Sequence, residues 1–451
     1  MKKKSLFDSY WQKYSVGEQW KLTANQVDPV SQIVVIPSLA ERETLPYTLA
    51  SLAKNHPSSI QDSLIICVIN NKVNAPTHVI ENNSQTIRYL DALVGRKSLR
   101  TFSGERELHL LLTDIADANM NMAYIDASSA GCAMPSDKGG VGLARKIGMD
   151  TALRLLQNDS SSSRTIVSLD ADTLVQNNYL SVIKNHFAQG AKTAIVAYEH
   201  QMPADARERA AICCYEIFLR YWVLALNYAK SPWAFHSIGS TIAVSQDAYL
   251  DVRGMNKREA GEDFYFLNKL AKIGKIDYIN NTCVYPSARL SSRVPFGTGK
   301  RIQRFLEGPH QDEYRLYDPR IFAVLAGWLR LMNAMILEDE NRILKETDLI
   351  HPHLKFYLEE SHFPLTWSRI RRMTKQERSL KKHFHDWFDG FRTLKFIHYF
   401  TREVYPQMNM FSALEKIFAM SGRFLPDFSR SEEIPPLREQ IGILNCLRTI
   451  T

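Results

Sequence analysis

The chain has 451 residues, enough for two or three domains with a well-buried core. Its composition is 45% hydrophobic and 23% charged without a low-complexity tract, which excludes fibrous and disordered proteins. The net charge is +8, but no nucleic-acid recognition motif accompanies it, so nucleic acid is not an expected partner. Six scattered cysteines form no Cys-x-x-Cys pair, which argues against a zinc ribbon or a disulfide framework and favours a reducing, cytoplasmic location.

The first 30 residues are predicted to be an N-terminal extension. They begin "MKKKSLFDSYWQKY", where a polar and aromatic segment follows the basic start, so we expect no signal peptide. Two apolar stretches, 210–229 and 321–337, come nearest to membrane spans. The first carries Glu216 and Arg220 and the second carries Arg330, so both are predicted to be buried helices.

Short apolar runs alternate with helical patterns between residues 31 and 201. The predicted strands are 33–37, 63–71, 120–128, 165–172 and 193–201, and the predicted helices are 39–55, 142–158 and 177–187. This alternation is typical of an α/β fold with a mostly parallel sheet flanked by helices. After about residue 310 the strand signals fade, and a helical C-terminal region is expected.

Polar residues follow three of the predicted strands. Because ligands bind outside the carboxyl ends of parallel strands, we expect these residues to converge on one crevice. They are Pro37, Ser38, Asn70, Asn71, Asp170 and Asp172.

Two acidic pairs are candidates for chemistry. Asp170 and Asp172, in "TIVSLDADTLV", offer hard oxygen ligands for Mg²⁺ or Mn²⁺, which can bridge a diphosphate. The alternative is that Asp172 caps the next helix while Asp170 pairs with a basic residue. Glu262 and Asp263 open a helix, where they either complement its dipole or act on an acceptor proton as a general base.

Two basic, glycine-containing segments are candidates for phosphate binding. In "DKGGVGLARK", the glycines permit close backbone approach, while Lys138 and Arg145 supply positive charge; ordinary turn chemistry is the alternative. In "YPSARLSSRVPFGTGKR", Arg289, Arg293 and Lys300 suit a phosphate clamp or lid, and a basic surface loop is the alternative.

The order of these motifs carries more information than any one of them. A strand with "VVIPSLAERE" is followed by the glycine-rich turn into Ala-Arg, the Asp-x-Asp strand end, "HSIGSTIAVSQDAYLDVRGM" and Gly-Glu-Asp. This order resembles the family 2 glycosyltransferases of the GT-A fold, over roughly residues 31 to 300.

The resemblance implies a metal-dependent, non-processive transfer of a sugar from a nucleotide-diphospho-sugar, such as a UDP- or GDP-sugar, to an acceptor hydroxyl. Asp172 and Asp170 would hold Mn²⁺ or Mg²⁺, and Asp263, beside Glu262, would be the base of an inverting reaction. The residues implied in donor binding are Pro37, Ser38, Glu41, Asn70, Lys138, Gly140, Arg145, Asp170 and Arg293.

The chain departs from this family in several ways. Asn70-Asn71 stands where many relatives have an acidic pair, so the identity of the donor's nucleobase is not determined by the resemblance. The Gln-x-x-Arg-Trp region of processive synthases is not evident. His310 is a candidate third metal ligand, and a retaining mechanism would then demote Asp263 to a binding residue. A nucleotidyltransferase and a non-catalytic nucleotide-sugar-binding protein are the competing classes.

The resulting domain prediction is an extension (1–30), a catalytic domain (31–310) and a helical region (311–451). Residues 364–402 hold ten Lys and Arg against three Asp and Glu. This excess indicates a solvated helical face, contact with the inner face of an anionic membrane, or contact with an acidic acceptor. The helical region could also form a homodimer.

Overall fold

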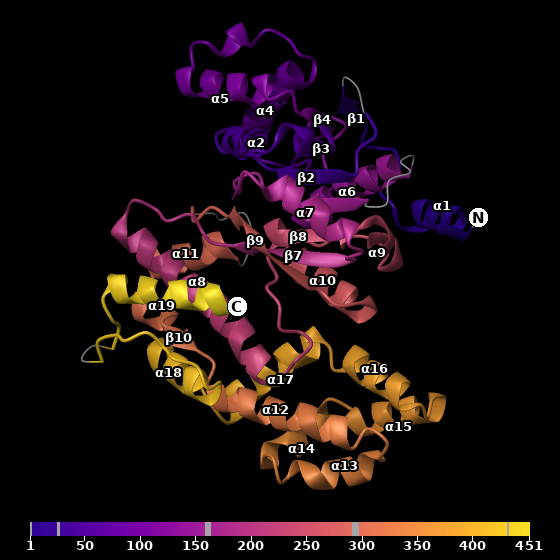
Figure 1. The fold of residues 1–451 in the computed structure, drawn as a ribbon, viewed down its shortest axis with the longest axis vertical. Helices are drawn as coiled ribbons and strands as arrows, with labels where there is room; N and C mark the ends of the chain where they lie inside the picture. Colours follow the sequence, from indigo (N-terminus) through magenta and orange to yellow (C-terminus); the bar gives the residue numbers. More distant parts are fainter. Residues whose placement is uncertain (1, 25–27, 158–163, 291–296, 431–432) are drawn as a thin grey trace. The chain divides into compact units, whose positions relative to one another are not determined.

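The computed structural model describes residues 2–24, 28–157, 164–290, 297–430 and 433–451 (Figure 1). The chain forms two compact units. The first comprises Met1–Gln201 and Ser237–Ser287, and the second comprises Met202–His236 and Ala288–Thr451.

The first unit is built on a sheet that has nine strands among the described residues. Six strands run in one direction, and the short strands β1, β6 and β8 run against them, so the prediction of a mostly parallel sheet is confirmed. The spatial order is β1-β4-β3-β2-β5-β8-β7-β9-β6. The strands are β1 (Leu22–Ala24), β2 (Gln32–Ser38), β3 (Ser63–Asn70), β4 (Asn121–Ala127), β5 (Thr165–Ser168), β6 (Leu174–Val175), β7 (Thr193–Tyr198), β8 (Ile242–Ser245) and β9 (Asp277–Tyr285).

The centre of the sheet explains the apolar runs of the sequence. Every residue of β2, β3 and β5 is buried, as expected for parallel strands covered on both faces. In the parallel register Ser38 of β2 lies opposite Ile69 of β3, and Val35 of β2 lies opposite Ser168 of β5. The carboxyl ends of these three strands are therefore neighbours, and the polar strand ends converge as predicted.

Helices flank this sheet. Helix α6 packs against β2 and β3 so closely that a Cβ on Gly148 would come within 2.3 Å of Val35 Cγ1. The helices of the first unit are α1 (Lys2–Tyr14), α2 (Leu45–Ala53), α3 (Pro57–Gln61), α4 (Thr77–Val94), η1 (Leu99–Phe102), α5 (Arg106–Asp117), α6 (Val141–Leu156), α7 (Tyr179–Ala188), η2 (Gly239–Thr241), α9 (Gln246–Asp251) and α10 (Glu262–Ile273).

The N-terminal segment contributes to this unit. Strand β1 pairs antiparallel with β4, and Tyr10 of α1 is buried against helix α6, where its hydroxyl donates to Asp150. Lys146 and Tyr249 donate to the same carboxylate at 3.2 and 2.8 Å. A buried polar cluster therefore ties α1 to the sheet domain.

The second unit is mainly helical, as the loss of strand signals predicted. Trp328 lies at its core, with edge-to-face contacts to Phe363, Phe384 and Phe388. Its elements are α8 (Ala206–Tyr228), α11 (Thr298–Glu307), η3 (His310–Glu313), β10 (Arg315–Leu316), α12 (Pro319–Ala334), α13 (Glu340–Thr347), α14 (Pro352–Glu360), α15 (Phe363–Met373), α16 (Glu377–Trp387), α17 (Gly390–Glu403), β11 (Met408–Asn409), α18 (Met410–Met420) and α19 (Leu437–Ile450).

Both long apolar segments are helices, α8 and α12. Among the described residues, α8 alone is long and apolar enough to cross a membrane by length and composition. Two thirds of its most apolar window is buried inside the protein, which is also the property of a core helix.

Candidate functional site

The Asp-x-Asp segment leaves β5 in a tight, well-held turn. The amide of Thr173 donates to the carbonyl oxygen of Asp170 at 3.1 Å, and Thr48 of α2 donates its hydroxyl to the carbonyl of Ala171 at 3.0 Å. Gln201 holds the carbonyl of Asp172 at 3.1 Å. The backbone is fixed from both sides, while the Asp170 and Asp172 side chains stay half-buried at the carboxyl edge of the sheet.

Arg145 of α6 is the centre of the site. Its side chain is 4% exposed and donates from Nη2 to Asp170 Oδ1 at 2.6 Å, and from Nε to Glu262 Oε1 at 2.9 Å. A third bond runs from Nη1 to the Ser168 hydroxyl at 2.6 Å. Burial opposes the charge of Arg145, but Asp170 and Glu262 more than offset it and raise the pKa of the guanidinium. The observed bonds make Arg145 the residue that positions two carboxylates, and its contact with the nucleotide or its phosphates remains a prediction.

Asp170 is held through both of its carboxylate oxygens. Oδ1 accepts from Arg145, and Oδ2 accepts from the hydroxyl of Ser240, which lies in η2. Gly239 precedes Ser240. A Cβ on Gly239 would come within 2.1 Å of Arg145 Nη2, so only glycine at position 239 leaves room for the guanidinium. Ser168 and Ser240 were missed by the sequence reasoning, although Ser240 lies within the quoted "HSIGSTIAV" segment.

The second acidic pair joins the same cluster. Glu262 and Asp263 open α10, and Glu262 is buried where it accepts from Arg145, so it does more than complement the helix dipole. Asp263 Oδ1 accepts from its neighbour's amide, that of Phe264, at 2.7 Å. Burial first, and the Glu262 carboxylate second, raise the pKa of Asp263 to about 7. A carboxyl with this pKa is suited to accepting a proton near neutral pH.

The ends of β2 and β3 present unsatisfied polar atoms. Ser38 Oγ and Asn70 Oδ1 are buried and have no hydrogen-bond partner within the described part of the chain. Asn71, by contrast, is saturated, because its amide donates to two carbonyls and its oxygen accepts from Asn83. Buried polar groups are normally paired, so Ser38 Oγ and Asn70 Oδ1 are exceptions at these strand ends. Glu41 is also buried and accepts from the Thr44 hydroxyl.

The glycine-rich turn before α6 packs against the protein itself. A Cβ on Gly140 would lie 2.6 Å from the Glu259 Cα, and one on Gly142 would lie 2.5 Å from the carbonyl oxygen of Arg258. The close approach that these glycines allow is therefore made by the segment before α10. Lys138 stays exposed, 3.9 Å from Asp137. Its role and that of Gly140 in donor binding remain predictions.

Two further predicted site residues, Arg293 and His310, fall wholly or partly outside what the structure describes. Arg293 is outside the described residues. His310 belongs to η3 of the second unit, and its side chain is also outside what the structure describes. In the same unit Arg301 pairs with Glu313 at 3.2 Å and stacks over the ring of Phe218.

Asp170 and Asp172 are the residues of this site that could hold a divalent cation. The described residues contain no group of three or more His, Cys, Asp or Glu side chains arranged to hold a metal. Mg²⁺ needs no such cage, because it commonly takes one or two carboxylates and completes its shell with water and phosphate oxygens. Asp172 with Asp170 provides that number of carboxylates.

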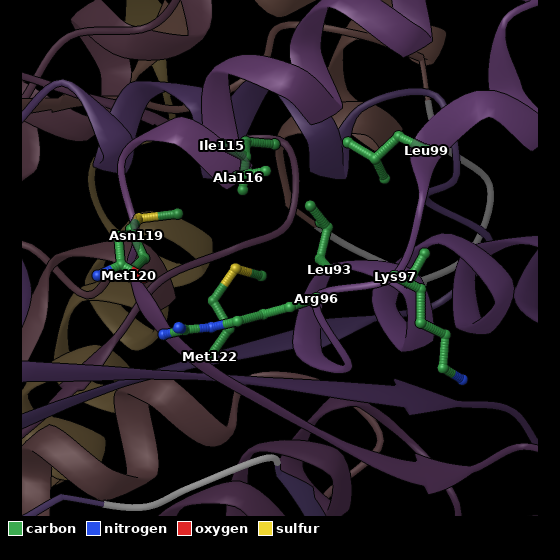
Figure 2. A pocket seen from close by; sticks show the side chains of 10 residues that line it. Leu93, Arg96, Lys97, Leu99, Ile115, Ala116, Asn119, Met120 and Met122 are labelled. Carbon is green, nitrogen blue, oxygen red and sulfur yellow. The ribbon is translucent and has the colours of Figure 1, made fainter.

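A separate cavity lies at the opposite edge of the sheet. Figure 2 shows this space of about 220 Å³ beside the start of β4, with Leu93, Ile115 and Met122 in its lining and the Arg96 side chain beside them. It is formed at the amino end of β4, between that strand and the carboxyl-terminal parts of α4 and α5. It is therefore distinct from the cluster around Arg145.

No protein-family model matches the chain, and no curated protein matches it. Among solved structures, it is similar to S. aureus TarS 1–349, at 10% identity and a TM-score of 0.34, over 89% of this chain and 95% of that chain. The TarS 1–349 complex with UDP-GlcNAc gives 11% and 0.35 over the same shares. The mannosyltransferase PcManGT from Pyrobaculum calidifontis, in complex with GDP-Man and Mn²⁺, gives 10% and 0.35 over 99% of this chain and 94% of that one. Identities and TM-scores this low assign neither a fold nor an activity to this chain.

Proposed function

We propose that this chain is a non-processive glycosyltransferase of family 2 and GT-A type, which moves a sugar from a nucleotide-diphospho-sugar to an acceptor hydroxyl. One observation carries the proposal. The buried Arg145 joins the half-buried Asp-x-Asp carboxylate Asp170 to the buried Glu262 at the carboxyl edge of the parallel strands. Two motifs 92 residues apart in the sequence thus form a single acidic site where such sheets bind ligands.

The donor nucleoside would lie over the ends of β2 and β3. Ser38 Oγ and Asn70 Oδ1 supply one hydroxyl and one amide for a nucleobase or ribose, and both are unsatisfied in the described structure. Pro37 and Glu41 flank Ser38 and complete this subsite. A UDP- or GDP-sugar is the donor class that we propose.

The diphosphate of the donor would bind beside the Asp-x-Asp turn. Asp172, with Asp170, would hold Mn²⁺ or Mg²⁺, and the cation would neutralise charge on the diphosphate leaving group. Asp170 is already oriented by Arg145 and Ser240, so it contributes a fixed carboxylate, whereas Asp172 supplies the direct ligand. A third ligand role for His310 remains a prediction.

Asp263 is the proposed general base. It lies directly after Glu262, whose negative charge helps to raise the pKa of Asp263 to about 7. In its ionised form it accepts the proton of the acceptor hydroxyl as the oxygen attacks the anomeric carbon, and the nucleoside diphosphate leaves from the opposite face. The sugar configuration is then inverted.

The first experiment is a thermal-shift panel of UDP-, GDP- and TDP-sugars with and without Mn²⁺. A donor at about a hundred times its Kd is expected to raise the Tm by about 5 °C, and only with the metal present. Pyrophosphate release from a nucleoside triphosphate would instead indicate a nucleotidyltransferase. Donor binding without turnover across a broad acceptor panel would indicate a non-catalytic binding protein.

A further inference from the structure

Helix α15 has two contrasting faces. Phe363 and Trp367 are buried in the core of the second unit, and the Trp367 indole donates to the carbonyl of Glu338 at 3.1 Å. On the outer face, Leu365 is 75% exposed and Met373 is 69% exposed. The helix is therefore anchored through one side while it presents large apolar side chains on the other.

The outer face also carries cations. Arg369 and Arg372 are exposed, and with Leu365 and Met373 they follow the i, i+4, i+7, i+8 spacing that places side chains on one helical face. We call Leu365, Arg369, Arg372, Met373 and the adjoining Lys375 and Arg378 the α15 face.

The cations of the α15 face differ from the two lysines farther along α16, the helix on which Arg378 itself lies. Lys381 pairs with Glu377 at 2.7 Å, and Lys382 is likewise paired with a carboxylate. None of the four cations of the α15 face has an ion pair with any residue that the structure describes, and all four are exposed. Unpaired cations interleaved with exposed apolar side chains suit a partner that is both anionic and apolar.

We propose that the α15 face docks on the surface of an anionic lipid bilayer. Arginine and lysine side chains can reach lipid phosphates while Leu365 and Met373 enter the boundary between headgroups and acyl chains. A second copy of the chain fits less well, because a two-fold contact would bring the same cationic face against itself. Nucleic acid would match the charge but would leave both apolar side chains unused.

Sedimentation with extruded vesicles tests this proposal on the full chain. The vesicles are phosphatidylcholine alone, or equal parts of phosphatidylcholine and phosphatidylglycerol, at low salt and at about 1 M salt, where the Debye length is about 3 Å. Wild type is expected to bind the anionic vesicles at low salt at least about tenfold more tightly than the neutral ones. High salt should remove most of this difference.

Two variants locate the binding surface. R369E/R372E is expected to weaken anionic-vesicle binding at least about tenfold, since each basic residue near the surface contributes about fivefold. L365S/M373S should weaken it several-fold at both salt concentrations. All four positions are exposed, so the Tm should stay that of wild type.

The matched control is R88E/K192E in the first unit, which makes the same change in net charge at exposed positions outside the α15 face. It should bind vesicles like wild type. An equal loss in this control, no preference for anionic vesicles, or preferential capture by a nucleic-acid duplex would overturn the proposal. So would a shift from dimer to monomer in R369E/R372E with vesicle binding unchanged, as measured by light scattering.

Discussion

Replacing Arg145 by methionine is expected to destabilise the protein by removing the charge that balances Glu262. The Glu262 side chain is 4% exposed, and removing one partner of a buried ion pair costs about 3–5 kcal/mol of unfolding free energy. The Asp170 side chain is 33% exposed, so solvent compensates much of its loss, and its partnership adds little to this cost. At about 2–4 °C per kcal/mol for a unit of this size, the expected fall in Tm is about 10 °C.

Urea unfolding of the full chain measures the cost, and a double mutant isolates its cause. R145M/E262Q is expected to recover at least about 1 kcal/mol relative to R145M, because no uncompensated charge then remains buried. The matched control is R154M on the same helix, where Arg154 is 56% exposed and pairs with an exposed Glu18. Its expected cost is below about 1 kcal/mol. A cost of R145M no larger than that of R154M, or no recovery in the double mutant, would refute the account of Arg145.

Three further predictions concern the base, the glycine turn and the nucleoside subsite. Because folding raises the pKa of Asp263 to about 7, the stability that its protonated form contributes is present at low pH and is lost as the pH rises to about 7. Donor turnover should rise over the same pH range, because the ionised form is the base. In unfolding and turnover measurements over a pH series, D263N should abolish both dependences. G142A should lower the free energy of unfolding in urea by about 1–3 kcal/mol, since its Cβ would lie 2.5 Å from backbone carbonyl oxygens. The control G104A has open space around its Cβ and should leave the free energy of unfolding almost unchanged. Equal losses in the two variants would contradict the packing at Gly142. S38A should leave the Tm unchanged or higher, yet weaken donor binding, measured by calorimetry, about tenfold. N70A should weaken donor binding by a similar factor. Unchanged affinity in both variants would contradict the proposed nucleoside subsite.

The sequence predicted the parts of the fold that depend on local pattern. The apolar runs of β2, β3 and β5 predicted buried parallel strands, and the polar residues after them predicted the carboxyl edge of the sheet, because both follow from strand burial. The same reasoning predicted that a strand ends at Asp170 and Asp172; β5 ends earlier, at Ser168, and both aspartates lie in the turn that follows it.

The role of Arg145 was beyond such reasoning. Its partners come from β5, from the turn that follows and from the start of α10, and no periodicity shows that these segments meet. The contribution of Ser240 depends in the same way on η2 lying beside Asp170. The glycines before α6 were predicted to permit close approach of a ligand, and their pattern alone does not show that the chain's own backbone lies against Gly140 and Gly142.

The contribution of the first 24 residues was also hidden. Their composition is polar and aromatic without a clear period, yet Tyr10 enters a buried cluster with Asp150, and β1 adds an edge strand to the sheet. Such contacts are long-range, and their energy comes from partners about 100 or more residues away in the sequence.

The most direct test of the central claim is nucleoside diphosphate release from a sugar-nucleotide panel, measured with wild type and D172N at saturating Mn²⁺. Wild type is expected to release UDP or GDP from at least one donor, slowly to water and faster with an acceptor, and only when the metal is present. D172N should lose at least about a hundredfold of this rate, a loss of about 2.7 kcal/mol of transition-state stabilisation. Release by D172N at the wild-type rate, or no release from any sugar nucleotide, would contradict the account.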